Sequence, residues 1–155
     1  MTTTIASWQI PILDGFHEMS ESERSALHFA AEGEGVCLSD PKRHILISVG
    51  AQTINAFSAL LLSTRDLAKN AEKQIARLMQ SNGYRREQFV TRKIDGLHAE
   101  GYRYTYTAQS VGMTGETYVV KDGKTVIYFH VYVREAHKDE GFAIWNAFLD
   151  GMHKS

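Results

Sequence analysis

The period of apolar and polar residues changes along the chain, and the clearest pattern lies in its second half. Apolar residues alternate with polar ones in four consecutive segments, 89–94, 97–108, 116–121 and 125–134. A period of two is typical of strands, whose successive side chains point to opposite faces of a sheet. Asp95-Gly96 and Asp122-Gly123 supply the positive-φ residues that two-residue hairpins require, and we place the third reversal at residues 110–114. The pattern therefore predicts an antiparallel meander.

A helical period predicts a long helix over residues 64–82. Ser63 offers an N-cap, Asp66 occupies the third position, and Gly83 can adopt the left-handed conformation that ends a helix. The apolar residues fall on one face, at Leu67, Ala71, Ile75, Leu78 and Met79. On the opposite face lies a basic stripe made of Arg65, Lys69, Lys73 and Arg77. Charged helix faces are usually only solvated, so we assign this stripe no partner.

A second helix is predicted at the C-terminal end, over residues 139–152. Its aromatic and aliphatic residues share one face, namely Phe142, Trp145, Phe148, Leu149 and Met152, and Asp139 and Glu140 lie near the positive helix start. Near the other end, Ser20 and Glu23 have capping-box spacing and precede a short apolar run at 26–30. We therefore expect a short early helix as well.

Two strands are expected in the first half of the chain. Trp8, Ile10 and Ile12 alternate with other residues before the Asp14-Gly15 break, which predicts a short strand at the edge of the sheet. After the Asp40-Pro41 turn, residues 45–49 are apolar on both sides, which favours a central strand. Together with the helices, these strands predict an α+β fold in which a twisted antiparallel sheet is packed with helices on both faces, an α/β/α sandwich formed by a single domain over residues 1–155.

Composition narrows the classes of function. Seventeen Lys and Arg against 18 Asp and Glu provide no global field for binding nucleic acid. Cys37 is the only cysteine, so no internal disulfide can form, and no apolar run is long enough to span a membrane. We expect a cytoplasmic protein that binds no nucleic acid and does not span a membrane.

The residues that could carry chemistry form no recognisable catalytic site. None of the seven histidines has the spacing of a metal motif, and we expect no metal and no cofactor. His98, Glu100 and His130 could meet across adjacent strands for acid/base work, but exposed strand polar residues explain them more simply. Cys37 has no neighbouring His to stabilise a thiolate, so a small buried residue is the better interpretation.

Tyrosines gather on one side of the predicted meander. They alternate along two strands as Tyr102, Tyr104 and Tyr106 and as Tyr128 and Tyr132, with His130 between the last two. Tyrosine offers a large contact area, few rotamers and a hydrogen-bonding tip, which suits a binding surface. The alternative is that a terminal helix covers this face and makes it part of the core.

The connection at residues 52–62 is unusually apolar. It contains Phe57, Leu60 and Leu61, and exposure of such a run would exceed what monomers usually tolerate. Burial as a short helix is the simpler expectation. The functional alternative is a self-association or partner-binding element that flanks the tyrosine face.

Four local features resemble the PsbP-like superfamily. They are Ile10-Pro11 before Asp14-Gly15-Phe16, the stretch 93–99 that opens the meander, the stretch 118–124, and the final aromatic helix. The order of elements is similar over most of the chain. The resemblance implies relatives that mostly bind rather than catalyse, including DcrB-related bacterial proteins and chaperones of type VI secretion effectors.

These observations lead to a hypothesis of a non-enzymatic, chaperone-like interaction module. It would bind a hydrophobic segment of another protein through Tyr102, Tyr104, Tyr106, Tyr128, His130 and Tyr132, flanked by Phe57, Leu60 and Leu61. A homodimer stays open at this stage. The alternative is a small-molecule-binding domain or an enzyme with a pocket near His130.

Overall fold

A computed structural model describes residues 1–25 and 34–155 of the chain. Its larger sheet has seven antiparallel strands in the order β3-β4-β5-β9-β8-β7-β6. The bounds are β3 His17–Glu18, β4 Glu34–Asp40, β5 Ile45–Thr53, β6 Arg85–Ile94, β7 Leu97–Ala108, β8 Val111–Asp122 and β9 Thr125–Arg134. A small sheet combines β1 Thr2–Ile5, β2 Trp8–Pro11 and β10 His153–Lys154.

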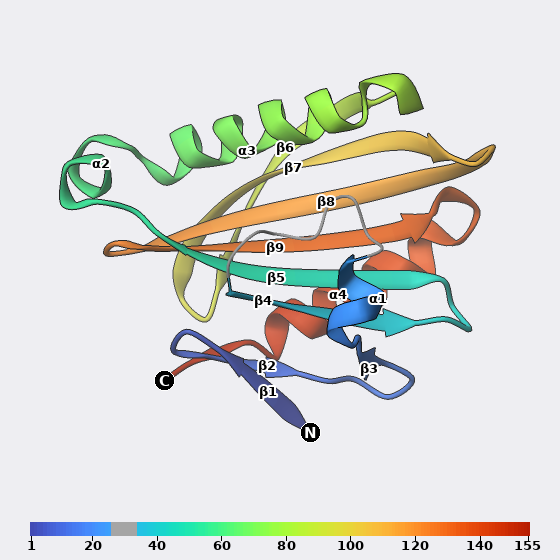
Figure 1. Cartoon of the computed structure of the whole chain (residues 1–155), viewed down its shortest axis with the longest axis horizontal. Coiled ribbons are helices and arrows are strands. Elements are labelled where there is room, and N and C mark those ends of the chain that lie inside the picture. Colours follow the sequence, from blue (N-terminus) through green and yellow to red (C-terminus); the bar gives the residue numbers. More distant parts are fainter. Residues whose placement is uncertain (26–33) are drawn as a thin grey trace.

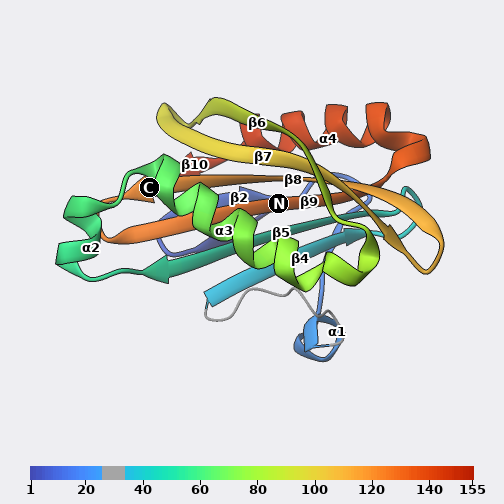
Figure 2. The ribbon, with the colours of Figure 1, turned by 90° about the horizontal axis from the view of Figure 1, so that it is seen from above.

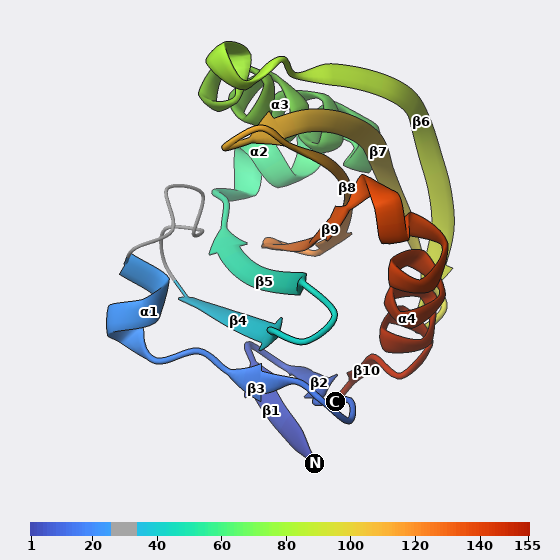
Figure 3. The same cartoon turned by 90° about the vertical axis from the view of Figure 1, so that its right-hand side faces the viewer.

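Four α-helices and two short 3-10 turns complete the described part. They are α1 Glu21–Ser25, α2 Ala56–Leu61, α3 Thr64–Leu78, η1 Gln80–Asn82, η2 Glu135–His137 and α4 Lys138–Asp150. Helix α3 lies on one face of the large sheet, whereas α4 and the small sheet lie on the other (Figure 1; Figure 3). The predicted α/β/α arrangement is therefore confirmed, with each helix on its own face.

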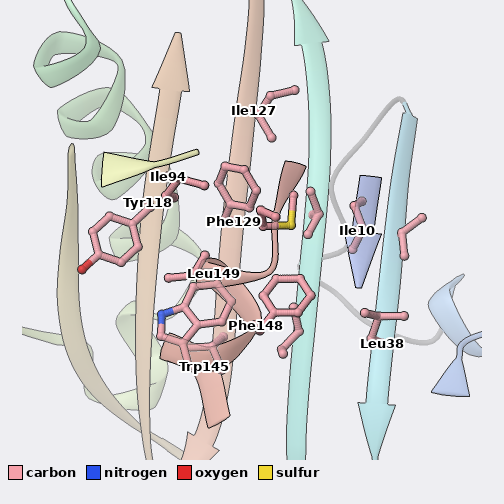
Figure 4. Packing of buried hydrophobic residues seen from close by; sticks show 14 of the residues in the cluster. Ile10, Leu38, Ile94, Tyr118, Ile127, Phe129, Trp145, Phe148 and Leu149 are labelled. Carbon is pink, nitrogen blue, oxygen red and sulfur yellow. The ribbon is translucent and has the colours of Figure 1, made fainter. Parts of the chain in front are cut away.

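The larger core fills the space between the sheet, α4 and the small sheet. Trp145 and Phe148 of α4 stack with ring centroids 5.6 Å apart, and Trp8 of β2 meets Phe129 of β9 edge-on at 5.9 Å. Figure 4 shows Trp145, Phe148 and Leu149 pointing from α4 toward the strands. Large aromatic side chains contribute much buried area each, so this layer secures both the C-terminal helix and the N-terminal hairpin.

Local signals fix the ends of α3 as the sequence predicts. The Ser63 hydroxyl accepts from the Asp66 N–H at 3.1 Å, and the Asp66 carboxylate accepts from the Ser63 N–H at 2.9 Å. Gly83 ends the helical region in the left-handed conformation, with φ of 72°. A capping box of the same kind joins Ser20 and Glu23 at α1, but the apolar run expected at 26–30 lies outside the described residues.

One of the three predicted hairpin turns is confirmed and the other two are displaced. Asp95 and Gly96 both have positive φ. The β8–β9 loop is Gly123-Lys124 rather than Asp122-Gly123, because Asp122 is the last residue of β8 and pairs with Thr125, and only Gly123 has positive φ, at 62°. The remaining turn is Gln109-Ser110, with φ of 48° and 69°, so the predicted reversal at 110–114 is wrong. Glycine was the misleading signal there, because Gly112 lies inside β8, opposite Thr107.

The N-terminal region also differs from the prediction. β2 is the middle strand of the small sheet, between β1 and β10, and is therefore not an edge strand. β4, which pairs with β5 over residues 34–40, was not predicted, because Val36, Cys37 and Leu38 are only three apolar residues beside glycines. β5 lies between β4 and β9, as expected for a central strand.

One buried ion pair ties the meander to α4. The Glu116 carboxylate, 2% exposed, accepts from the Arg103 guanidinium at 2.8 Å and from the Trp145 indole N–H at 3.1 Å. The Arg103 guanidinium also lies 4.1 Å from the centroid of the Phe142 ring. Both carboxylate oxygens are thus satisfied, as a buried charge requires.

Removing this carboxylate should destabilise the fold strongly. We expect Glu116→Ala to lower the free energy of unfolding by about 3 kcal/mol, because it leaves the Arg103 charge and the Trp145 N–H without their partner. Asp150→Ala removes the exposed partner of Arg92 and should lower it by less than about 1 kcal/mol. Urea unfolding of the two variants makes the comparison, and equal losses would contradict this role for Glu116.

Candidate functional site

Strand register gathers the tyrosine face into transverse rows. One row crosses six neighbouring strands, with its members directly opposite one another: Cys37, Ser48, His130, Thr117, Tyr102 and Phe89. Opposed residues in a sheet share a face, so these side chains lie on the side that carries α3. The sequence predicted that the tyrosines and His130 share a face, and the structure places them together.

The aromatic rings of this face form a continuous layer. Tyr102, Tyr104 and Tyr106 follow one another along β7 at centroid distances of 5.7 and 5.8 Å, and Tyr84 adds a fourth ring 5.2 Å from Tyr104. On β9, His130 stacks between two tyrosines, 6.5 Å from Tyr128 and 6.3 Å from Tyr132. We call these seven residues the tyrosine layer.

Space for the layer comes from a glycine on the next strand. A Cβ atom at Gly115 of β8 would lie 2.5 Å from Cζ of Tyr104, closer than two carbon atoms can approach. The absence of a side chain therefore allows the Tyr104 ring to lie flat against β8.

Helix α3 covers most of the tyrosine layer. Ile75 and Met79 pack against the β7 tyrosines and Tyr132, and Tyr102 and Tyr104 have no exposed surface. Tyr128 keeps partial exposure. The cover is the central helix α3 rather than a terminal helix, because α4 lies on the opposite face. Partner contact with the buried tyrosines would require α3 to move, and that role stays a prediction.

His130 is a neutral, buried member of the layer. Its Nδ1 lies 2.7 Å from the Thr117 hydroxyl, and burial lowers the pKa of the ring to about 4. Burial also raises the pKa of the neighbouring Tyr102 and, to about 12, that of Tyr106. The layer therefore carries no charge at neutral pH, which is what a stable cover by an apolar helix face requires.

The acid/base cluster considered from sequence does not assemble. His98 Nε2 and Glu100 Oε1 meet at 2.8 Å on β7, but His130 is opposite Thr117 on β8 and belongs to another row. Cys37 is buried with its thiol 3.8 Å from the Ser48 hydroxyl, in agreement with a small buried residue. Within residues 1–25 and 34–155, no three metal-ligating side chains gather.

The apolar connection forms a helix, as expected, but the expectation of burial is wrong. Phe57, Leu60 and Leu61 of α2 expose 71%, 82% and 60% of their surface, and the helix has no buried residue. We call these three residues the α2 patch. Adjacent residues Ile54 and Leu62 are partly buried and pack against the α3 cluster that includes Tyr128. The patch therefore borders the only tyrosine of β9 that keeps partial exposure.

Hydrogen bonds at both ends hold α2 in place. The Asn55 side chain accepts from the Ser58 N–H at 2.7 Å, which caps the helix. The Ile54 N–H donates to the Lys124 carbonyl, and the Lys121 ammonium donates to the Leu62 carbonyl, both at 2.8 Å. The patch is thus an ordered projection fixed to the β8–β9 hairpin, at one end of the sheet (Figure 1).

A small hollow lies between α3 and the edge strand β6. It measures about 180 Å³ and is lined by Arg65, Ala68, Lys69, Phe89, Thr91, Glu100 and Gly101. A shallow polar hollow of about 440 Å³ lies near the start of β6, against Arg85, Arg86 and Glu135. His130 lines neither of these two hollows, although the alternative of a small-molecule-binding domain placed its pocket near this residue.

His130 makes stability depend on pH. In the pH range from about 4 to 6.5, the unfolded chain binds a proton at this histidine that the folded chain excludes, so stability should fall as the pH is lowered through this range, by up to about 3 kcal/mol. His130→Gln should remove that dependence, whereas His137→Gln, at an exposed site, should retain it. Urea unfolding at several pH values tests this, and equal slopes for His130→Gln and the parent chain would refute it.

Comparisons with known proteins give a likeness of fold. No protein-family model and no curated protein matches the sequence. Among solved structures, the cyanobacterial PsbP (CyanoP) from Synechocystis sp. PCC 6803 superposes with a TM-score of 0.71 at 16% identity, over 96% of this chain and 87% of that one. LpqN, involved in cell envelope biogenesis of Mycobacterium tuberculosis, gives a TM-score of 0.62 at 13% identity, over 94% and 81%.

These likenesses agree with the meander and terminal helix from which the resemblance was inferred. They extend over nearly the whole described chain. Because the sequence identities are low, the superpositions show a shared fold and not a shared activity. They single out neither the DcrB-related proteins nor the effector chaperones within the superfamily. As a separate finding, no helix of the described residues is long and apolar enough to cross a membrane. The superpositions over nearly the whole chain show that it has the PsbP-like fold.

Proposed function

We propose that this protein is a non-catalytic accessory module that binds an apolar segment of another protein through the α2 patch. The observation that carries the proposal is the exposure of Phe57, Leu60 and Leu61 on an ordered helix. Soluble domains rarely leave adjacent large apolar side chains in water without a binding role. The neutral, covered tyrosine layer supports the proposal, because it provides a rigid base for the helix rather than a reaction centre.

Preorganisation makes α2 suitable as an anchor. The Asn55 cap and the bond from Lys121 fix the helix before binding, so little ordering entropy is lost on association. Burying three such side chains is worth on the order of 5–8 kcal/mol in gross terms, while association costs about 4–15 kcal/mol. The patch therefore needs further contacts at its rim, for which half-exposed Tyr128 and Gln52 are in position, joined through the Tyr128 hydroxyl at 3.4 Å.

The small area of the α2 patch favours a different protein as the partner over a second copy of this chain. A standard interface buries about 800 Å² per partner, and three side chains of this size fall well short of that. A symmetric contact between two α2 patches would be weak. A partner groove that encloses α2 gains the rim contacts as well, which is the helix-in-groove mode of recognition.

Photo-cross-linking from the patch tests the proposal. A benzophenone amino acid at position 57 or 61 should yield the same cross-linked protein in producing cells, because both side chains enter one interface. The same amino acid at position 73, on the exposed face of α3, is the control and should not yield it. Identical products from 57 and 73, or none from either patch position, would count against the patch. A cross-link between two copies of the chain would favour the homodimer instead.

With the cross-linked protein purified, one substitution measures the role of the patch. We expect Leu60→Ser to weaken binding at least ten-fold, since Leu60 is the most exposed member and its burial on binding is worth about 1.5–3 kcal/mol. The free energy of unfolding should change by less than about 0.5 kcal/mol, because the side chain is already in water. Lys73→Ser is the matched control and should bind as the parent chain does. Unchanged affinity of Leu60→Ser would contradict the proposal.

A further inference from the structure

The two edges of the large sheet are protected unequally. One edge is β3, which has only two residues, His17 and Glu18. The other is β6, which has ten residues, of which seven are exposed, and which pairs only with β7. Figure 3 shows β6 along the outer margin of the sheet, beside α3 and α4. A long edge strand offers backbone N–H and C=O groups to a further strand.

The second half of β6 is regular enough to template such pairing. A bulge interrupts the register between Arg86 and Gln88, but residues 88–94 pair with β7 without a break. This stretch contains no proline, which would remove a ladder donor. About seven consecutive residues can therefore accept a new strand on their outer side.

Charge is concentrated around this edge. Residues 64–94 contain eight Lys and Arg against three Asp and Glu, whereas the remainder of the chain contains nine against fifteen. Two of the three acids are already engaged, Asp66 in its capping box and Glu72 by the Tyr84 hydroxyl and Arg86. Arg65, Lys69 and Lys93 form no ion pair with any described residue. Arg86 and Arg92 are neutralised by Glu72 and Asp150, so the positive charge left at this edge is that of Arg65, Lys69 and Lys93, although the net charge of the chain is −1.

The geometry of α3 directs two of these cations toward β6. Arg65 and Lys69 form one wall of the 180 Å³ hollow, and Phe89 and Thr91 of β6 form its floor together with Glu100 and Gly101 of β7. Figure 2 shows α3 above the sheet, with β6 along the rim. Ligand pockets for small molecules are usually about 300–1,000 Å³, so this hollow has room for one or two side chains rather than a whole ligand.

We propose that β6 binds an extended acidic segment of another protein by strand addition. The new strand would lie against residues 88–94, and its side chains would alternate between the two faces of the sheet. Acidic side chains on the α3 face would meet Arg65, Lys69 and Lys93, and an apolar side chain among them would cover the half-exposed ring of Phe89. Glu100, the one carboxylate that lines the hollow, is paired with His98 at 2.8 Å.

This surface is separate from the α2 patch, so the inference does not rest on the proposed function. A negative cross-linking result at residue 57 would leave it intact. The two surfaces also differ in chemistry, since α2 offers apolar side chains and β6 offers backbone groups in a basic setting.

Titration with synthetic peptides tests the inference on the full chain. The probe is a capped seven-residue peptide that alternates Glu with Val, followed by amide chemical shifts and amide exchange. We expect shifts and new exchange protection at residues 88–94. The same peptide with two of its valines replaced by proline keeps its charge but cannot form a ladder, and we expect at least ten-fold weaker binding. A peptide that alternates Lys with Val should not bind.

Two charge-reversed variants separate docking from general attraction. Arg65→Glu/Lys69→Glu places acids on the wall of the hollow and should weaken binding of the acidic peptide at least ten-fold. Lys73→Glu/Arg77→Glu makes the same change of charge further along α3, away from the hollow, and should weaken it no more than three-fold. Circular dichroism checks that both variants keep the fold.

Four results would overturn the inference. They are the absence of shifts at millimolar peptide, equal binding of the proline-containing peptide, equal losses in the two variants, and tighter binding of a twelve-residue oligothymidylate than of the acidic peptide. The last result would identify the basic edge as a surface for nucleic acid rather than for protein.

Discussion

The contact between α3 and the tyrosine layer is the constraint on which the remaining features depend. Both faces of the large sheet carry large aromatic or aliphatic side chains, and both are covered: the apolar face of α3 covers the rings of β7 and β9, while α4 covers the aliphatic side. Burial under α3 keeps the tyrosines protonated, and burial in the same layer keeps His130 neutral. The face that the sequence indicates as a candidate binding surface is therefore a polar but uncharged part of the core.

The position of α3 also determines what is left exposed. The helix begins at Thr64, two residues after Leu62, so the preceding chain must turn back from β5 in a short distance. As a result α2 projects from the end of the sheet with its apolar side chains in water. At its other end α3 leads through Gly83 into β6, which becomes the outermost strand. Both proposed surfaces are thus consequences of one docking arrangement.

Much of the fold could be predicted from sequence because its signals are local. The period-two segments, the Asp-Gly turns and the capping box at Ser63 each specify an element without reference to the remainder of the chain. The turn at Gln109-Ser110 was misplaced because two non-glycine residues adopt positive φ there, which no composition rule favours. β4 was missed because its apolar run is only the three residues 36–38 beside glycines, although the strand forms a hairpin with β5.

The candidate site was only partly predictable for the same reason. The tyrosines were correctly placed on one face, but which helix covers them depends on tertiary packing that a periodicity cannot show. Large apolar residues are usually buried, so the sequence predicted burial of Phe57, Leu60 and Leu61, whereas the structure exposes them. Arg65 and Lys69 were recognised as part of a basic stripe, whereas their position beside Phe89 and Thr91 follows only from the way α3 crosses β7 toward the sheet edge.

Native-state hydrogen exchange across the chain tests the central claim most directly, because it reports whether α3 leaves the tyrosine layer without global unfolding. The account predicts that the amides of residues 102–106 and 128–132 exchange only with global unfolding, while those of α2 exchange by local opening at lower free energy. Exchange of residues 102–106 together with α3, several kcal/mol below the global free energy of unfolding, would contradict it. That result would show that the tyrosine face opens to solvent in the native protein.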